Sequence, residues 1–235
     1  EQAGKLGPLF NVASCSSCHE RNGRNVIEAE GMPLHTTVVK LYAGDDLGRQ
    51  LQPQEGEVLR QSYEMSEVEL GDGSMLEVQR PVYAGLDAEL EPSIRVARRL
   101  IGLGLLEAVD EDVILERAVS ESCDSGEVIS GRPSLVEDPE TGALRLGRFG
   151  WKAEKVDVRH QIADALDQDL GVTTALMGAT DPELDDAALD ELEAYMRLLA
   201  VPPRRSPEDP TVLRGEEVFA NLGCEGCHRA ELTTG

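Results

Sequence analysis

Two stretches of the chain share one pattern, C-x-x-C-H: Cys15-Ser16-Ser17-Cys18-His19 near the start and Cys224-Glu225-Gly226-Cys227-His228 near the end. Together they contain four of the five cysteines and two of the four histidines among the 235 residues. With this composition, roughly 0.002 copies of the pattern are expected by chance. Two copies therefore indicate a shared chemistry.

The spacing of the pattern suits covalent attachment of haem. Two thiols three positions apart on a helical turn can each bond to one vinyl group on the same porphyrin edge, and the next residue can bind the iron. The sequence therefore predicts two covalently bound haem c groups. The predicted attachment residues are Cys15, Cys18, Cys224 and Cys227, and the predicted iron ligands are His19 and His228.

Two other sites use similarly spaced cysteines. The two pairs could together form a four-cysteine zinc site, but zinc would not require a histidine after each pair. A thioredoxin-like redox pair would need a preceding strand within a βαβ unit, and neither stretch has that setting.

The sequence around the second stretch repeats features of the first. Phe10 and Phe219 each lie five residues before the first cysteine of their stretch. A helix is expected to begin at Pro210 or Thr211, with Val218, Phe219 and Leu222 on one apolar face. A helix that leads into the haem-binding turn is typical of cytochrome c folds.

The residues between the two stretches predict a mainly α fold, in which two cytochrome c-like units carry a small β-hairpin insertion and long loops. Alternating apolar residues on both sides of Gly71-Asp72-Gly73-Ser74 predict the hairpin. Helical periodicity predicts helices over 93–108, 112–119, 158–170 and 182–199. Gly102 and Gly104 within the first of these suggest close approach of another element.

We expect a first cytochrome c-like domain with insertions over residues 1–201. Residues 202–235 are expected to form a proline-rich linker and the start of a second haem domain.

Several phrases carry a resemblance to a known family. They are Gly7-Pro8-Leu9-Phe10-Asn11, Ile101-Gly102-Leu103-Gly104-Leu105-Leu106-Glu107, Ile129-Ser130-Gly131-Arg132-Pro133, Gly147-Arg148-Phe149-Gly150-Trp151-Lys152-Ala153 and Tyr195-Met196-Arg197-Leu198-Leu199-Ala200-Val201-Pro202. With the two C-x-x-C-H stretches, they resemble the bacterial di-haem oxidoreductases, also called thiol oxidoreductases. The resemblance implies an exported protein whose redox role is related to that of di-haem cytochrome c peroxidases.

The chain departs from that family in two places. Only seven residues follow His228, whereas family members continue further, so we expect the second unit to be truncated. At 122–127 the family has a more acidic loop that resembles a cation-binding turn, which leaves calcium here weakly supported.

Other residues have both functional and structural interpretations. The resemblance implies that Trp151 could relay electrons between haems, whereas the alternative is core packing. Cys123 is left over, and we expect a buried apolar filler rather than a reactive thiol. Candidate distal iron ligands are His35, His160, Met32, Met65, Met75, Met177 and Met196, and the sequence does not choose among them.

The composition restricts the partners. A formal net charge of −23 argues against nucleic acid or an anionic membrane and is compatible with a basic redox partner, or simply with solubility. No apolar run approaches the roughly 20 residues that span a bilayer. No signal peptide opens the chain, which we expect to reflect processing of a periplasmic or extracellular protein.

The sequence therefore predicts a di-haem oxidoreductase that is peroxidase-like and passes electrons between its haems, with a peroxide as a candidate oxidant. The alternative is a non-catalytic electron carrier with both irons six-coordinate. A third interpretation is an inactive fragment that needs a further C-terminal part. Hydrolase, nucleotide-binding and nicotinamide-binding motifs are absent from the sequence.

Overall fold

A computed structural model describes ten segments of the chain: 11–23, 26–34, 36–43, 46–51, 60, 62–83, 91–118, 121–122, 128–129 and 131–235. By their contacts, residues group into two compact units. Unit 1 combines Glu1–Leu100 with Ile162–Leu189, and unit 2 combines Ile101–Gln161 with Asp190–Gly235. The expected domain boundary between residues 201 and 202 stays a prediction.

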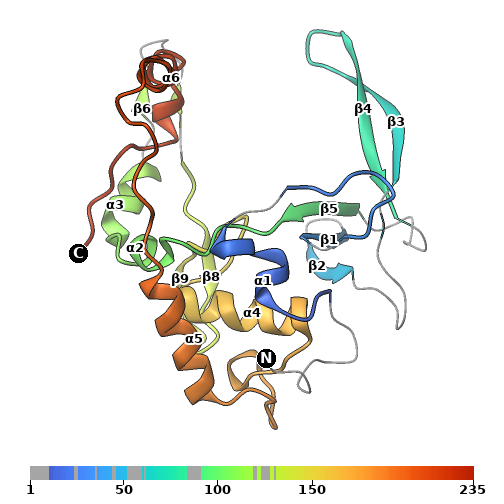
Figure 1. Ribbon diagram of the computed structural model, residues 1–235, viewed down its shortest axis with the longest axis vertical. Helices are drawn as coiled ribbons and strands as arrows, with labels where there is room; N and C mark the ends of the chain where they lie inside the picture. The colour runs from blue at the N-terminus through green and yellow to red at the C-terminus, as the bar shows by residue number, and fades with distance from the viewer. Residues whose placement is uncertain are drawn as a thin grey trace. The chain divides into compact units, whose positions relative to one another are not determined.

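Unit 1 contains a three-stranded antiparallel sheet in the order β2-β1-β5 (Figure 1). Its strands are β1 (Thr37–Ala43), β2 (Asp46–Leu51) and β5 (Glu91–Val96). The central strand opens with the β-branched run Thr37-Val38-Val39, which favours extended backbone. Val39 is fully buried and forms a small core with Leu34 and Tyr83.

The β-hairpin predicted in this unit is confirmed. Strands β3 (Ser62–Glu69) and β4 (Met75–Val82) pair antiparallel, and Glu69 lies opposite Met75 at the closed end. In the turn, Asp72 Oδ1 accepts hydrogen bonds from the backbone N–H of Ser74 at 2.9 Å and from its hydroxyl at 2.6 Å.

The helices of unit 1 are short except for one. They are α1 (Cys15–Cys18) and η1 (Glu20–Asn22) near the N-terminus, most of α4 (Val158–Leu170), and η3 (Ala175–Met177). The bounds of α4 confirm the helix predicted over 158–170. Its buried residues recur at helical spacing: Val158, Ile162, Ala163, Leu166 and Leu170.

Unit 2 joins short helices and two small hairpins. Its helices are α2 (Leu103–Glu107), α3 (Glu111–Leu115), η2 (Glu116–Ala118), most of α5 (Asp186–Leu198), α6 (Pro210–Asn221) and η4 (Cys224–Gly226). Strand β6 (Glu121–Ser122) pairs with β7 (Val128–Ile129), and β8 (Leu135–Glu137) pairs with β9 (Leu144–Leu146). No helix in the described segments is long and apolar enough to cross a membrane.

The predicted starts and ends of the unit 2 helices agree in part with the structure. Helix α6 begins at Pro210 as predicted, and the Asp209 side chain accepts a hydrogen bond from Thr211 N–H as its N-cap. The helix expected over 112–119 is present as α3 followed by η2. Helix α5 begins four residues later than expected, at Asp186.

The expectation of a mainly α fold is wrong. Nine strands accompany the six α-helices among the described residues. The helix predicted over 93–108 is the main error, because its first part is strand β5, which pairs with β1. Gly102, with a φ of 81°, adopts the left-handed conformation, so only Leu103–Glu107 is helical.

Gly104 permits the close approach that its position suggested. A Cβ atom there would lie 2.3 Å from the backbone carbonyl oxygen of Arg197, so helix α2 can meet the end of α5 only without a side chain at this point. Close to this contact, Gly102 N–H donates a hydrogen bond to the Leu199 carbonyl at 2.9 Å.

Replacing Gly104 with alanine should therefore destabilise the protein by about 1–3 kcal/mol, because backbone must move to admit the methyl group. The matched control is Gly215→Ala, since Gly215 is also helical but has no atom within 4 Å of its added Cβ. The control should be neutral or stabilising by up to about 1 kcal/mol. Urea unfolding of both variants measures the difference, and equal effects would contradict the close-packing argument.

Candidate functional site

The first C-x-x-C-H stretch forms a single helical turn in unit 1. Helix α1 consists of the four residues Cys15–Cys18, and His19 is its C-cap. The backbone N–H of His19 donates a hydrogen bond to the Cys15 carbonyl at 2.8 Å. Both cysteines are free thiols rather than a disulfide. One turn of backbone thus holds two thiols and an imidazole in consecutive order.

Burial sets the protonation of this first turn. Cys18 is buried, and desolvation, with added repulsion from Asp169 and Glu28, raises its pKa to about 12. Burial also lowers the pKa of His19, although backbone groups of Arg98 and Gly23 oppose the shift. A neutral imidazole is the form that binds iron.

The second stretch repeats the turn in unit 2. Helix η4 covers Cys224–Gly226, and His228 N–H donates to the Cys224 carbonyl at 2.9 Å. Gly223, with a φ of 72°, lets the chain leave α6 and enter this turn directly. The Phe219 ring on α6 meets the His228 ring edge-on, with 6.0 Å between centroids. Cys224 and Cys227 are also free thiols.

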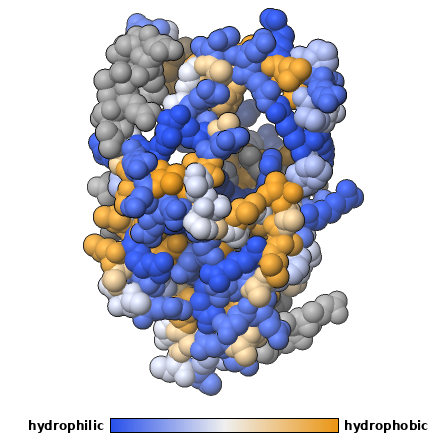
Figure 2. All heavy atoms as spheres, turned by 90° about the vertical axis from the view of Figure 1, so that its left-hand side faces the viewer, coloured by the Kyte–Doolittle hydropathy of each residue, from blue (hydrophilic) through white to orange (hydrophobic). Residues whose placement is uncertain are grey.

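Apolar side chains are exposed beside this second turn. No residue of α6 is buried, and several large apolar ones face solvent: Leu213, Val218, Phe219 and Leu222. Figure 2 shows that apolar residues lie at the surface among hydrophilic ones on the face it presents. Such apolar surface beside two thiols and an imidazole suits a bound macrocycle.

Both turns therefore fit a covalently attached haem. Each offers two free thiols, one helical turn apart, and an imidazole that follows them. Within the described segments, no group of three or more His, Cys, Asp or Glu residues is placed to hold a metal ion by itself.

The other candidate residues differ in how exposed their side chains are. Trp151 lies in a turn and is 42% exposed. Of the candidate distal ligands, His160 and Met196 are buried, whereas Met32, Met65, Met75 and Met177 are exposed. His35, Cys123 and most of the 122–127 loop lie outside the described residues.

A polar cluster around Asp169 is a feature that the sequence did not reveal. Asn11 N–H donates to the Asp169 carbonyl at 2.9 Å, just before the first turn. The buried Gln50 side chain donates through Nε2 to Asp169 Oδ1 at 2.7 Å and to Asn11 Oδ1 at 2.9 Å. Desolvation raises the pKa of Asp169 to about 6, although the Gln50 hydrogen bond and Lys40 oppose it. The residues of this polar cluster are far apart in sequence, so no local motif identifies them.

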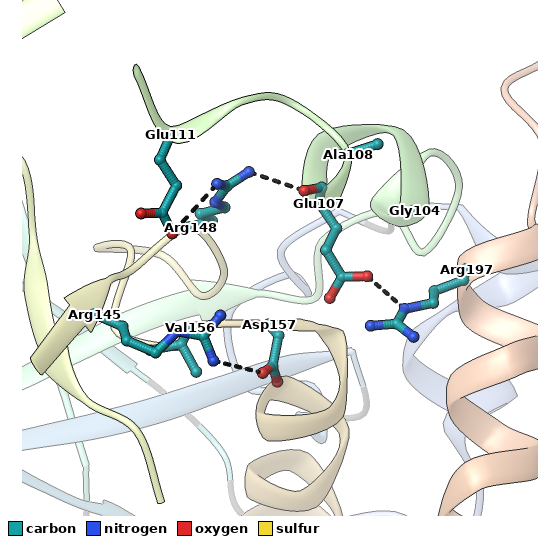
Figure 3. Close-up of a pocket in the computed structure, with 9 residues that line it drawn as sticks. All are labelled: Gly104, Glu107, Ala108, Glu111, Arg145, Arg148, Val156, Asp157 and Arg197. Atoms are coloured by element: carbon teal, nitrogen blue, oxygen red, sulfur yellow. Dashed lines mark hydrogen bonds and ion pairs between the residues drawn. The ribbon is translucent and has the colours of Figure 1, made fainter. Parts of the chain in front are cut away.

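A second polar site is a pocket of about 360 Å³ in unit 2 (Figure 3). Arg148 donates to the backbone carbonyl of Glu107 at 2.9 Å, and the Glu107 carboxylate pairs with Arg197. Arg145 lies 3.7 Å from Asp157. The guanidinium groups of Arg145, Arg148 and Arg197 are thus all paired with protein oxygens. These interactions around the pocket link α2 and α5 to the residues around β9.

The Asp169 cluster makes stability depend on pH. The ordinary carboxyl pKa of 3.8 applies when the chain is unfolded, whereas the folded value is about 6, so the native state binds the proton more tightly. Asp169 therefore contributes most to the free energy of unfolding at low pH, and this contribution is lost as pH rises from about 4 to about 6. Asp169→Asn should become more stable than the wild type across this window, by up to roughly 3 kcal/mol above pH 6.

Urea unfolding at pH values from 4 to 8 measures this difference. The control is Asp167→Asn, which removes the same charge from the same helix without touching Gln50 or Asn11. The difference in unfolding free energy between Asp167→Asn and the wild type should change little between about pH 4 and about pH 6. An Asp169→Asn difference that is constant with pH would contradict the assignment.

Comparison with known protein families identifies part of the chain. Residues 86–181 match the family described as "Di-haem oxidoreductase, putative peroxidase". No curated protein and no solved structure matches the chain. The matched residues lie between the two C-x-x-C-H turns and include neither, so the match and the turns are separate observations. The segment 86–181, which is less than half of the chain, is therefore similar to the di-haem oxidoreductases.

Proposed function

We propose that the protein is a c-type cytochrome with two covalently bound haems, which acts as a peroxidase-like oxidoreductase and passes electrons between them. The observation that carries the proposal is the repeated turn of two free thiols and an imidazole. The similarity of residues 86–181 to the di-haem oxidoreductases supports haem attachment as the use of that turn.

The roles of the residues follow from the geometry of the two turns. In each turn the two thiols would each form a thioether with the porphyrin, and the imidazole would bind the iron. His19 is buried enough to favour the neutral ring, and Phe219 restricts the orientation of His228. The exposed apolar side chains of α6 would cover one edge of the second macrocycle. When bound, haem supplies one-electron redox chemistry and, where an axial position is open, reduction of a peroxide.

Partners and location extend the proposal. An oxidoreductase of this kind needs a redox partner, and a net charge of −23 favours a basic one. Haem attachment to C-x-x-C-H takes place outside the cytoplasm, so we place the protein in the periplasm or outside the cell. Trp151 remains the candidate for an electron relay. Residues 1–201 remain the proposed first haem domain, and residues 202–235 remain the proposed linker and start of a second haem domain.

Removal of one thiol pair should remove one covalent haem. In cells with a cytochrome c maturation system, Cys15→Ala with Cys18→Ala should leave one haem per chain, as should Cys224→Ala with Cys227→Ala. Haem staining of a denaturing gel and intact mass measure the number of haems. Cys123→Ala is the control and should retain both. A double variant that still carries two covalent haems would show that the attachment residues are wrong.

Spectra of the ferric protein distinguish the enzyme from an electron carrier. A peroxidase needs one iron with an open axial position, which gives a high-spin signal in paramagnetic resonance and reacts rapidly with peroxide. A non-catalytic carrier would have two six-coordinate, low-spin irons. We expect one high-spin and one low-spin haem, and two purely low-spin haems that do not react with peroxide would rule out the peroxidase activity.

A further inference from the structure

The Asp169 cluster joins three separate elements of unit 1 to the segment that enters the first haem-binding turn. Asp169 lies at the end of α4, Gln50 on β2, and Asn11 four residues before Cys15. Two hydrogen bonds from Gln50 Nε2, at 2.7 Å and 2.9 Å, connect the three residues. The carboxylate is thus held in a built polar site beside the turn.

Charged groups reach this carboxylate from each neighbouring element. Lys40 on β1 attracts it, and Asp164 on α4 repels it. Lys40 is itself bonded to the side chain of Gln168, next to Asp169. On α1, the thiols of Cys15 and Cys18 both interact electrostatically with Asp169, and Glu28 also acts on Cys18. The charge of Asp169 therefore affects the electrostatic potential at the proposed attachment residues.

A charge at this position would respond to the redox state of a haem attached to those thiols. Reduction of a ferric iron removes one positive charge from the site. A nearby carboxylate then loses part of the attraction that kept it ionised, so its proton affinity rises. Because Asp169 is already desolvated, its protonated and ionised forms are close in free energy near neutral pH, and a modest change in the field shifts the balance.

We propose that Asp169 takes up a proton when the haem at the first turn is reduced and releases it on oxidation. The inference rests on the proposed function. One electron from the redox partner reduces the iron, and one proton from solvent converts the Asp169 carboxylate to the acid. No other covalent bond in the protein changes, and reoxidation reverses both transfers.

Gln50 can hydrogen-bond to Asp169 in both protonation states of the carboxyl group. Its Nε2 donates to the ionised carboxylate, while its buried Oε1 has no hydrogen-bond partner among the described residues. The amide of a glutamine presents a donor and an acceptor that exchange places on rotation. After such a rotation, Oε1 would accept the O–H of the protonated acid, so neither state leaves the carboxyl group unpaired.

The potential of the first haem as a function of pH tests the proposal on the full holoprotein. Spectroelectrochemical titration of the wild type should show a potential that falls as pH rises through the range where Asp169 ionises. We expect about a tenfold difference in the proton affinity of Asp169 between the two redox states, which is about 59 mV for a one-electron couple. A variant with Cys224→Ala and Cys227→Ala identifies which of the two potentials belongs to the first haem.

Asp169→Asn should have a higher potential at alkaline pH, because a negative charge that favours the ferric state is gone, and should lose the pH dependence. Asp167→Asn is the control and should titrate like the wild type. An unchanged pH dependence in Asp169→Asn overturns the proposal.

Infrared difference spectra of the wild type give a readout that needs no variant. Reduction should produce a carboxylic acid C=O band that shifts when aspartate is labelled with ¹³C at its side-chain carboxyl. Absence of that band overturns the proposal even if Asp169→Asn fails to fold. If the wild type carries no covalent haem at the first turn, the proposed function itself is refuted. The haem-stained denaturing gel shows this before any potential is measured.

Discussion

One backbone hydrogen bond governs both candidate haem sites: the N–H of the histidine donates to the carbonyl of the first cysteine, in the first turn and in the second. This bond closes a single helical turn, so two thiols and an imidazole follow one another at fixed spacing.

The two turns lie in different surroundings, which gives them different electrostatics. In the first, Cys18 is buried and the charge of Asp169 reaches both thiols. In the second, Cys227 and His228 are exposed, and the Phe219 ring of α6 lies against His228. Burial and nearby charge both set haem potentials. Two haems on these turns would therefore differ in potential.

Local patterns in the sequence predicted the elements that depend on local interactions. The apolar periodicity of 158–170 identified α4, the alternation around Gly71–Ser74 identified the hairpin, and Pro210 marked the start of α6. The error at 93–108 has a non-local cause. Residues 91–96 pair with β1, whose paired residues lie 49 to 59 positions earlier, and this pairing overrides their helical pattern.

The sequence by itself determined which side chains the two candidate haem sites offer, because the order and spacing of Cys15, Cys18 and His19, and of their second copy, are local properties of one helical turn. Only the tertiary structure decided that β5 is a strand and that Asp169 lies beside the first turn. The reason is physical: the field at a carboxyl group depends on which groups surround it in space. Hydrogen bonds and electrostatic interactions join Lys40, Gln50 and Asn11 to the end of α4 around Asp169, although these residues are more than a hundred positions away from Asp169 along the chain.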